Sequence, residues 1–318
     1  MAAGPDPRRR RRREAKYARR RRTAAAAALT VVGAAVAAIV LSGGGGGAAS
    51  PAKKPATVAK RSSAPRCVPA ARVVRAGPDG TASVPILMYH VILPAPANAP
   101  FPGLYTVPSL FAAQMHALAA AGYHAVTMNE VWNYWHHGTP LPAGRPIVIS
   151  FDNGYESQYR EAFPVLRAMG WAGVENLQLS GLPPSQGGIT QREVRALVCA
   201  GWELDTQGYN HADLPALSPG ELNFQVAVAR QRIRALYHVA ADWFCYPSGQ
   251  YDPAVIDAVK AAGFRGSTTV IKGWASPGED PYTLPRLEVL GGTSPQTLLS
   301  ELDEIRSDPP PGPSYVTS

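Results

Sequence analysis

The sequence predicts an α/β fold in which a parallel sheet curves into an irregular (β/α) barrel, with an N-terminal transmembrane helix ahead of it. Short apolar runs rich in β-branched and aromatic residues alternate with amphipathic helical segments, which is typical of a parallel sheet covered by helices. The number of these repeats suits a barrel, and barrels of this kind carry their chemistry on loops after the carboxyl ends of the strands. Asp152, Gln207 and Pro247 each follow a predicted strand, so we expect them at that edge.

Each element is predicted from its own pattern. Short apolar runs bounded by turn-forming residues predict strands at Val84–His90, Pro146–Phe151, Gly173–Leu179, Trp202–Thr206, Trp243–Tyr246 and Gly266–Thr269. Apolar residues that recur every three or four positions, such as Phe163, Leu166 and Met169, predict helices. These helices are expected at Leu110–Ala121, Glu130–His136, Tyr159–Met169, Glu193–Ala200, Gly220–Leu236 and Pro253–Ala262.

Basic residues are concentrated outside the predicted domain. Residues 1–22 hold eleven Arg and Lys against two acidic residues, and residues 43–80 hold seven against one. From residue 81 onward, 13 basic residues are outnumbered by 20 acidic ones. The net charge of +8 and the pI near 9.5 therefore do not indicate nucleic-acid binding by the domain.

The stretch Thr23–Leu41 contains nineteen uncharged residues rich in Ala, Val, Leu and Ile, which is just long enough to span a bilayer as a helix. Because the basic block lies on its N-terminal side, we expect that end to stay cytoplasmic and the rest to lie outside the cell membrane. An uncleaved single-pass signal anchor is the preferred interpretation. A cleaved secretory peptide is the alternative, since Ala48-Ala49-Ser50 offers small residues for cleavage, and a soluble Ala-rich helix is a third.

The chain is therefore expected to have five parts. A Gly-, Ala-, Pro- and Lys-rich linker and a Pro-rich tail flank the domain. The parts are a basic cytoplasmic segment (1–22), a transmembrane signal anchor (23–42), a linker (43–80), the folded domain (81–306) and a tail (307–318).

Three cysteines in an exported chain allow at most one internal disulfide. Cys199 and Cys245 both lie within the predicted domain. A disulfide between them and two separate buried thiols are both open at this point.

Two polar motifs follow predicted strands. The first is Phe151-Asp152-Asn153-Gly154, and the second runs from Gly201-Trp202-Glu203-Leu204 to His211-Ala212-Asp213-Leu214. In order, these motifs resemble the metal-site motifs of the NodB-homology polysaccharide deacetylases, carbohydrate esterase family 4. Further blocks at Val84–His90, Phe244–Gly249 and Leu284–Leu287 resemble other parts of that family, and the opening block resembles the subgroup that acts on poly-N-acetylglucosamine-type polymers.

The resemblance implies metal-assisted hydrolysis of the N-acetyl groups of a cell-surface polysaccharide. It implies that Asp152 is the catalytic base and that Arg286 orients it. Many relatives use a late His as general acid, but no His follows His238, so His90 is the candidate for that role. The block Tyr246, Pro247 and Gly249 is expected to line the substrate groove, and Trp274, in a polar loop, is a further candidate for a sugar contact.

The metal ligands depart from the family pattern. His211 is retained, but Asn153 stands where the family has Asp and Gln207 where it has His. Zinc prefers nitrogen, sulfur and carboxylate ligands over neutral amides. We therefore expect a divalent metal such as zinc to be held weakly by His211, Asn153 and Gln207, and a site without metal is the alternative.

Three functions are compatible with these residues. The first is an active polysaccharide N-deacetylase with an altered metal site, and the second is a pseudoenzyme that binds N-acetylated glycans. The third is a metal-free glycosidase, for which Glu203 or Asp205 would supply a second carboxylate near Asp152.

Overall fold

The computed structural model describes residues 76–182 and 186–307. The predicted parts 1–22 and 23–42, together with most of 43–80 and 307–318, lie outside these residues. Within the described ranges, no helix is both long and apolar enough to cross a membrane.

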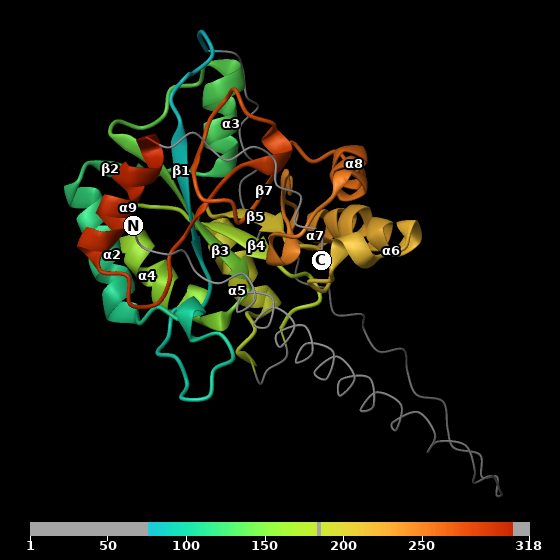
Figure 1. Ribbon diagram of the computed structural model, residues 1–318, viewed down its shortest axis with the longest axis horizontal. Coiled ribbons are helices and arrows are strands. Elements are labelled where there is room, and N and C mark those ends of the chain that lie inside the picture. The colour runs from blue at the N-terminus through green and yellow to red at the C-terminus, as the bar shows by residue number, and fades with distance from the viewer. Residues whose placement is uncertain (1–75, 183–185, 308–318) are drawn as a thin grey trace, which may run out of the picture. The chain divides into compact units, whose positions relative to one another are not determined.

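A parallel sheet forms the centre of the domain (Figure 1). Its main strands lie in the spatial order β7 (Gly266–Thr268), β6 (Trp243–Cys245), β5 (Glu203–Thr206), β4 (Val174–Leu177), β3 (Arg145–Asn153) and β1 (Val84–Tyr89). All neighbours along this path are parallel, as the alternation of strands and helices predicts. Two strands that were not predicted extend the sheet, namely β2 (Tyr123–Ala125), parallel to β3, and β8 (Trp274–Ala275), antiparallel to β1.

A short segment near the end of the domain crosses between the two sides of this sheet. Leu284 forms an isolated parallel bridge with Thr268 in β7, and β9 (Leu287–Glu288) pairs in parallel with Leu87 and Met88 of β1. Because β7 and β1 lie at opposite sides of the strand order, this segment links them. The fold is therefore a half-barrel whose open side is crossed by residues 284–288, and Arg286 lies in the middle of the crossing.

Helices pack around the sheet (Figure 1). They are α2 (Pro108–Ala120), α3 (Met128–His137), α4 (Phe163–Ala168), α5 (Gln191–Cys199), α6 (Pro219–Asn223), α7 (Ala229–Tyr237), α8 (Pro253–Ala261) and α9 (Pro295–Ser307). The long helix predicted at 220–236 is present as α6 and α7 joined by a π-helical turn, η5 (Phe224–Val228). A second π-helical turn, η2 (Gln158–Ala162), precedes α4.

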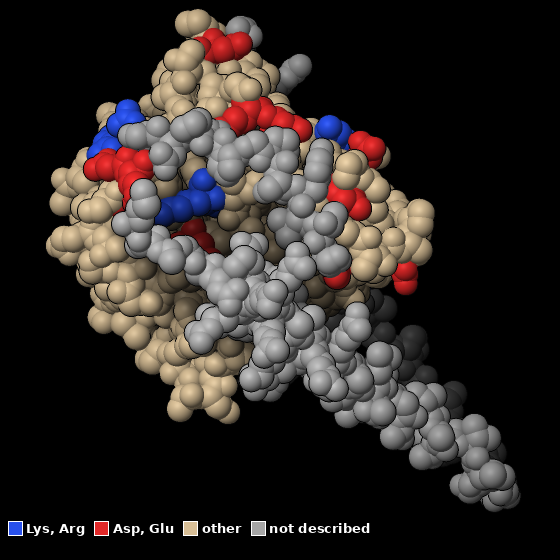
Figure 2. Space-filling view, viewed as in Figure 1, with Lys and Arg blue, Asp and Glu red and all other residues tan. Residues whose placement is uncertain are grey.

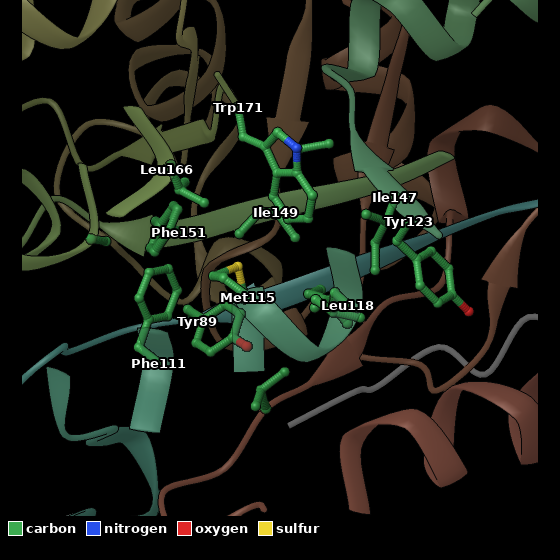
Figure 3. Close-up of a cluster of buried hydrophobic side chains, with 14 of the residues drawn as sticks. Tyr89, Phe111, Met115, Leu118, Tyr123, Ile147, Ile149, Phe151, Leu166 and Trp171 are labelled. Carbon is green, nitrogen blue, oxygen red and sulfur yellow. The ribbon is translucent and has the colours of Figure 1, made fainter. Parts of the chain in front are cut away.

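The two faces of β1 pack into different clusters, because side chains of a strand alternate between its faces. Leu87 and Tyr89 point outward into the largest core cluster (Figure 3). In this cluster Phe151 stacks on Trp202 at 5.1 Å between ring centroids. Val84 and Ile86 point inward and pack with Trp135 of α3 and with Trp243. The inner face of the sheet therefore has a packed apolar layer near the start of β1, and its polar residues lie toward the end of that strand.

Two carboxyl groups are buried together on β5. Asp205 is 0% exposed and accepts a hydrogen bond from the backbone N–H of Trp243, while Glu203 accepts one from the backbone N–H of Asn129. One oxygen of each carboxyl group lacks a hydrogen-bond donor. Burial raises the pKa of Glu203 to about 7 and also raises that of Asp205.

We expect this pair to make the stability of the domain depend on pH. Between pH 4.5 and about 7 the unfolded chain loses a proton that folded Glu203 keeps, so the free energy of unfolding falls as pH rises through that window. The loss is expected to be about 3 kcal/mol. Glu203→Gln should flatten the dependence in urea unfolding at pH 5 and pH 8, whereas Glu304→Gln, on exposed α9, should not. Equal slopes in the wild type and Glu203→Gln would contradict the assignment.

Candidate active site

The candidate site begins where β3 ends. Asp152 is 1% exposed, and after it the backbone turns through left-handed conformations at Asn153 (φ 79°) and Gly154 (φ 89°). A Cβ at Gly154 would lie 2.6 Å from the Leu177 side chain, so this exit from the strand requires glycine. The turn leaves the Asp152 carboxylate facing the inside of the half-barrel.

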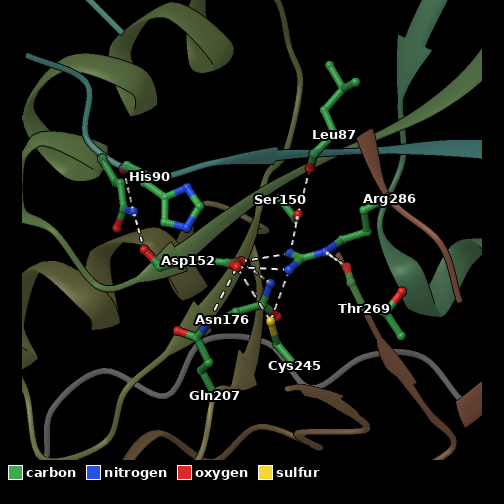
Figure 4. Close-up of polar contacts among 10 residues, drawn as sticks. Leu87, His90, Ser150, Asp152, Asn176, Gln207, Cys245, Thr269 and Arg286 are labelled. Carbon is green, nitrogen blue, oxygen red and sulfur yellow. Dashed lines mark hydrogen bonds and ion pairs between the residues drawn. The ribbon is translucent and has the colours of Figure 1, made fainter. Parts of the chain in front are cut away.

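Arg286 binds this carboxylate with both ends of its guanidinium group (Figure 4). Nη1 donates to Oδ1 at 2.8 Å and Nη2 donates to Oδ2 at 2.9 Å. The arginine is itself fixed, because its Nε donates to the Thr269 carbonyl oxygen at 2.8 Å and Nη1 also reaches Ser150 Oγ at 3.3 Å. The bidentate geometry therefore holds the orientation of Asp152 from the crossing segment.

Three more side chains surround the same carboxylate. Asn176 donates to Oδ1 at 2.9 Å, Gln207 donates to Oδ2 at 3.4 Å, and the Cys245 thiol lies 3.5 Å from Oδ2. Burial by itself would raise the pKa of Asp152, but the charge and hydrogen bonds of Arg286 outweigh it and lower the pKa to about 2. Asp152 is thus an oriented carboxylate at neutral pH.

Sequence reasoning missed Asn176 and the role of Cys245 as neighbours of Asp152. Asn176 faces Asp152 directly in the register of β3 and β4, so its position follows from strand pairing that the sequence does not specify. Cys245 is a free buried thiol, and burial raises its pKa to about 12. Cys199 is disulfide-bonded, so the two cysteines are not partners of one another.

Two histidines border the carboxylate. His90 directly follows β1, and Figure 4 shows it beside Asp152. Burial lowers the pKa of His90 and of His211, and the charge of the Asp152 carboxylate opposes this shift in both rings. At neutral pH both imidazoles are therefore uncharged.

The three residues expected to bind a metal do not form a zinc site. Gln207 turns its amide NH₂ toward Asp152, and its buried carbonyl oxygen has no hydrogen-bond partner. Asn153 contributes only a neutral amide, which leaves His211 as the one good zinc ligand of the three. Nowhere in residues 76–182 and 186–307 do three or more His, Cys, Asp or Glu side chains gather to hold a metal. The residues present do not fit a tightly bound zinc ion, and no step below passes through one.

Two residues expected to contact the substrate, Tyr246 and Trp274, have packed side chains in the structure. Tyr246 is 1% exposed, stacks on Tyr251 and donates its hydroxyl to the Tyr282 carbonyl oxygen, so it is a core residue. Trp274 pairs with Pro85 near the start of β1. His90 follows the other end of that strand, so at about 3.3 Å per residue Pro85 and His90 are roughly 16 Å apart along the strand. Trp274 therefore lies away from the end of the strand that carries the site.

Trp274 is held in place by the outer helix α9. Its indole N–H donates to the Leu302 carbonyl oxygen at 3.0 Å, and the Arg306 guanidinium lies 5.2 Å from its ring centroid. Pro247 and Gly249 are also buried, but Pro247 lies against Gly208, the residue after Gln207, and so borders the site. Of the four expected contacts, Pro247 is the one that the structure places next to a site residue.

The alternative of a metal-free glycosidase has no support in this arrangement. Asp205 is fully buried and accepts a hydrogen bond from the Trp243 backbone N–H, and Glu203 accepts one from the Asn129 backbone N–H. Neither carboxyl group is open to a sugar.

Comparisons with known proteins find similarity to polysaccharide deacetylases. Residues 141–267 match the sequence profile described as polysaccharide deacetylase. The "Putative polysaccharide deacetylase YxkH" of Bacillus subtilis is 25% identical over 225 residues, which cover 71% of this chain and 78% of that protein. The poly-beta-1,6-N-acetyl-D-glucosamine N-deacetylase of Escherichia coli K12 is 38% identical over 53 residues, 17% of this chain and 8% of that protein.

Solved structures show the same fold. The Streptococcus pyogenes deacetylase PplD, solved with acetate, superposes with a TM-score of 0.64 at 24% identity, covering 70% of this chain and 99% of that one. IcaB from Ammonifex degensii gives 0.59 at 23% identity, covering 70% of this chain and 97% of its own. Residues 141–267 are therefore similar to the polysaccharide deacetylase domain, as the motifs predict, and the domain shares its half-barrel α/β fold with these solved structures.

Proposed function

We propose that this protein is a hydrolase that removes N-acetyl groups from an N-acetylated cell-surface polysaccharide. The observation that carries the proposal is the buried Asp152 carboxylate, held bidentately by Arg286 at the carboxyl edge of the sheet. The N-acetylglucosamine polymer named for the Escherichia coli relative suggests the substrate class.

In the proposed reaction, Asp152 accepts a proton from the water that attacks the acetyl carbonyl carbon. Arg286 keeps the carboxylate charged and oriented, so the base is preorganised and little reorientation is needed when the reaction begins. Asn176 and Gln207 add hydrogen bonds that fix the same carboxylate. His90 and His211, both uncharged, complete the wall beside the attacking water.

We further propose that residues 23–41 anchor the chain in the cell membrane with the domain on the outer side. The support is the uncharged stretch with a basic block on its N-terminal side. A secreted form that lacks this segment is the alternative. Either location would bring the domain to a polysaccharide outside the cell.

The test is acetate release from N-acetylglucosamine oligomers by the purified full-length chain. We expect the wild type to release acetate and Asp152→Asn to lose at least about 100-fold in rate, since the Asn side chain cannot accept the proton. Glu304→Gln serves as the control for an acid on the exposed α9 surface. Binding of the oligomers without acetate release by the wild type would refute the hydrolase and indicate a glycan-binding protein.

A further inference from the structure

A buried glutamine joins the two strand ends that carry the site. Gln158 is 0% exposed and begins the π-helical turn η2. Its Nε2 donates hydrogen bonds to the backbone carbonyl oxygens of His90 at 2.9 Å and of Asp152 at 2.8 Å. Its Oε1 accepts a hydrogen bond from the backbone N–H of Tyr155 at 2.7 Å. Both donor hydrogens of this side-chain amide and one of its acceptor positions are therefore used on the backbone of the site.

These hydrogen bonds lie where the pairing of β1 with β3 stops. The parallel register of the two strands runs as far as Tyr89 and Phe151. His90 and Asp152 are the next residue of each strand, and the amide of Gln158 links their carbonyl groups. Gln158 therefore holds together the backbone that carries the proposed base and the backbone that carries the imidazole beside it.

The residues around Gln158 tie the same two segments to the start of η2. Ser157 is 6% exposed, and its Oγ accepts a hydrogen bond from the backbone N–H of Ile92 at 3.0 Å, which holds the chain that leaves β1. The hydrogen bond from Tyr155 holds the chain that leaves β3. π-Helical turns are rare and occur frequently at functional sites.

The other π-helical turn described above, η5, repeats this arrangement. Gln225 is 5% exposed, and its Oε1 accepts hydrogen bonds from the backbone N–H groups of Tyr209 and Asn210 at 3.0 and 3.1 Å. His211 follows directly, in a left-handed conformation with a φ of 57°. Each of these two turns thus directs a buried glutamine to backbone groups at or next to a site histidine.

We propose that Gln158 is a positioning residue for the proposed deacetylase reaction, an inference that rests on that function. Arg286 orients the Asp152 carboxylate, whereas Gln158 fixes the backbone from which this carboxylate projects, relative to His90. Gln158 is buried and acts through these residues without touching the substrate. Because a displacement of about 1 Å can cost about 100-fold in rate, loss of this link should slow the chemical step and leave substrate binding intact.

The first test removes the amide and keeps the length of the side chain. In the purified full-length protein, Gln158→Met should lower kcat for acetate release from N-acetylglucosamine oligomers by about 10- to 100-fold. KM should stay within about twofold, since an interaction that acts on the chemical step alone changes kcat. Gln158→Glu keeps the acceptor for the Tyr155 N–H and, protonated in this buried position, offers one donor in place of two. Its kcat should lie between those of the wild type and Gln158→Met.

Gln114 provides a matched control in the core. It is also 0% exposed, its Nε2 donates to the Thr293 carbonyl oxygen at 2.7 Å, and its Oε1 accepts from the Tyr89 hydroxyl at 2.9 Å. Gln114→Met should therefore lower the stability in urea unfolding by an amount similar to Gln158→Met. It should leave kcat at the wild-type value, because Gln114 contacts no residue of the site.

Two results would overturn the role of Gln158. One is a wild-type kcat in Gln158→Met, and the other is an equal fall of kcat in Gln158→Met and Gln114→Met, which would assign the effect to lost stability. If Gln158→Met does not fold, a wild-type kcat in Gln158→Glu would overturn the role instead. Absence of acetate release by the wild type would refute the proposed function and this inference with it. The other results require an active wild type, so the two failures are distinguishable.

Discussion

Arg286→Met is expected to destabilise the domain by about 3–5 kcal/mol, because it leaves the buried Asp152 carboxylate without its counter-charge. Both side chains are at most 2% exposed, so water cannot replace the lost partner. The pKa of Asp152 should rise, since burial then acts on it without opposition. Urea unfolding at neutral pH measures the first effect. We also expect the variant to lose acetate release, because Asp152 is no longer held as an oriented carboxylate.

A surface ion pair supplies the matched control for this prediction. Arg145 and Asp303 also form a salt bridge, at 3.4 Å, but their side chains are 39% and 69% exposed. Arg145→Met should therefore cost less than about 1 kcal/mol. The double variant Arg286→Met with Asp152→Asn should recover part of the lost stability, because neither remaining group carries a charge. A cost for Arg286→Met no larger than that for Arg145→Met would show that the buried pair does not stabilise the fold.

The sequence specifies the repeating part of the fold well. The strand β1 and the middle of β3 are mainly apolar runs, because a strand that is covered on both faces leaves little room for polar residues, whereas β4 and β5 carry polar side chains. Asp152 and Arg286 are identified from motifs far apart in the chain, and the structure brings their side chains into contact. Such residues are predictable because they lie at defined positions after or beside a strand.

The short strands β8 and β9 are not predicted from the sequence, because a strand of two residues shows no periodicity. β8 and β9 exist through their pairing with β1, which lies almost 200 residues earlier in the chain. The position of Trp274 also depends on this pairing. Its polar sequence surroundings suggest an exposed side chain, but its indole N–H donates a hydrogen bond to a carbonyl oxygen of α9.

The last prediction concerns the two positions, 153 and 207, at which this chain departs from the metal ligands of the family pattern. The double variant Asn153→Asp with Gln207→His is expected to tighten zinc binding by about 100-fold or more, because changes in the shell around a metal already alter affinity by 10- to 100-fold. A carboxylate and an imidazole would replace two neutral amides, and the new imidazole would end the hydrogen bond from Gln207 to Asp152. Metal content after dialysis against trace zinc, together with calorimetry, measures the gain.

Adding His211→Ala to the double variant should remove the gain, since His211 is the third ligand. If affinity rises and deacetylase activity rises with it, the wild-type site is a weakened metal site. If affinity rises while activity stays at the wild-type level, Asp152 and Arg286 carry the reaction without zinc. No rise in zinc binding would show that positions 153, 207 and 211 do not surround one ion. The amide of Gln207 would then serve to fix Asp152, as its hydrogen bond indicates.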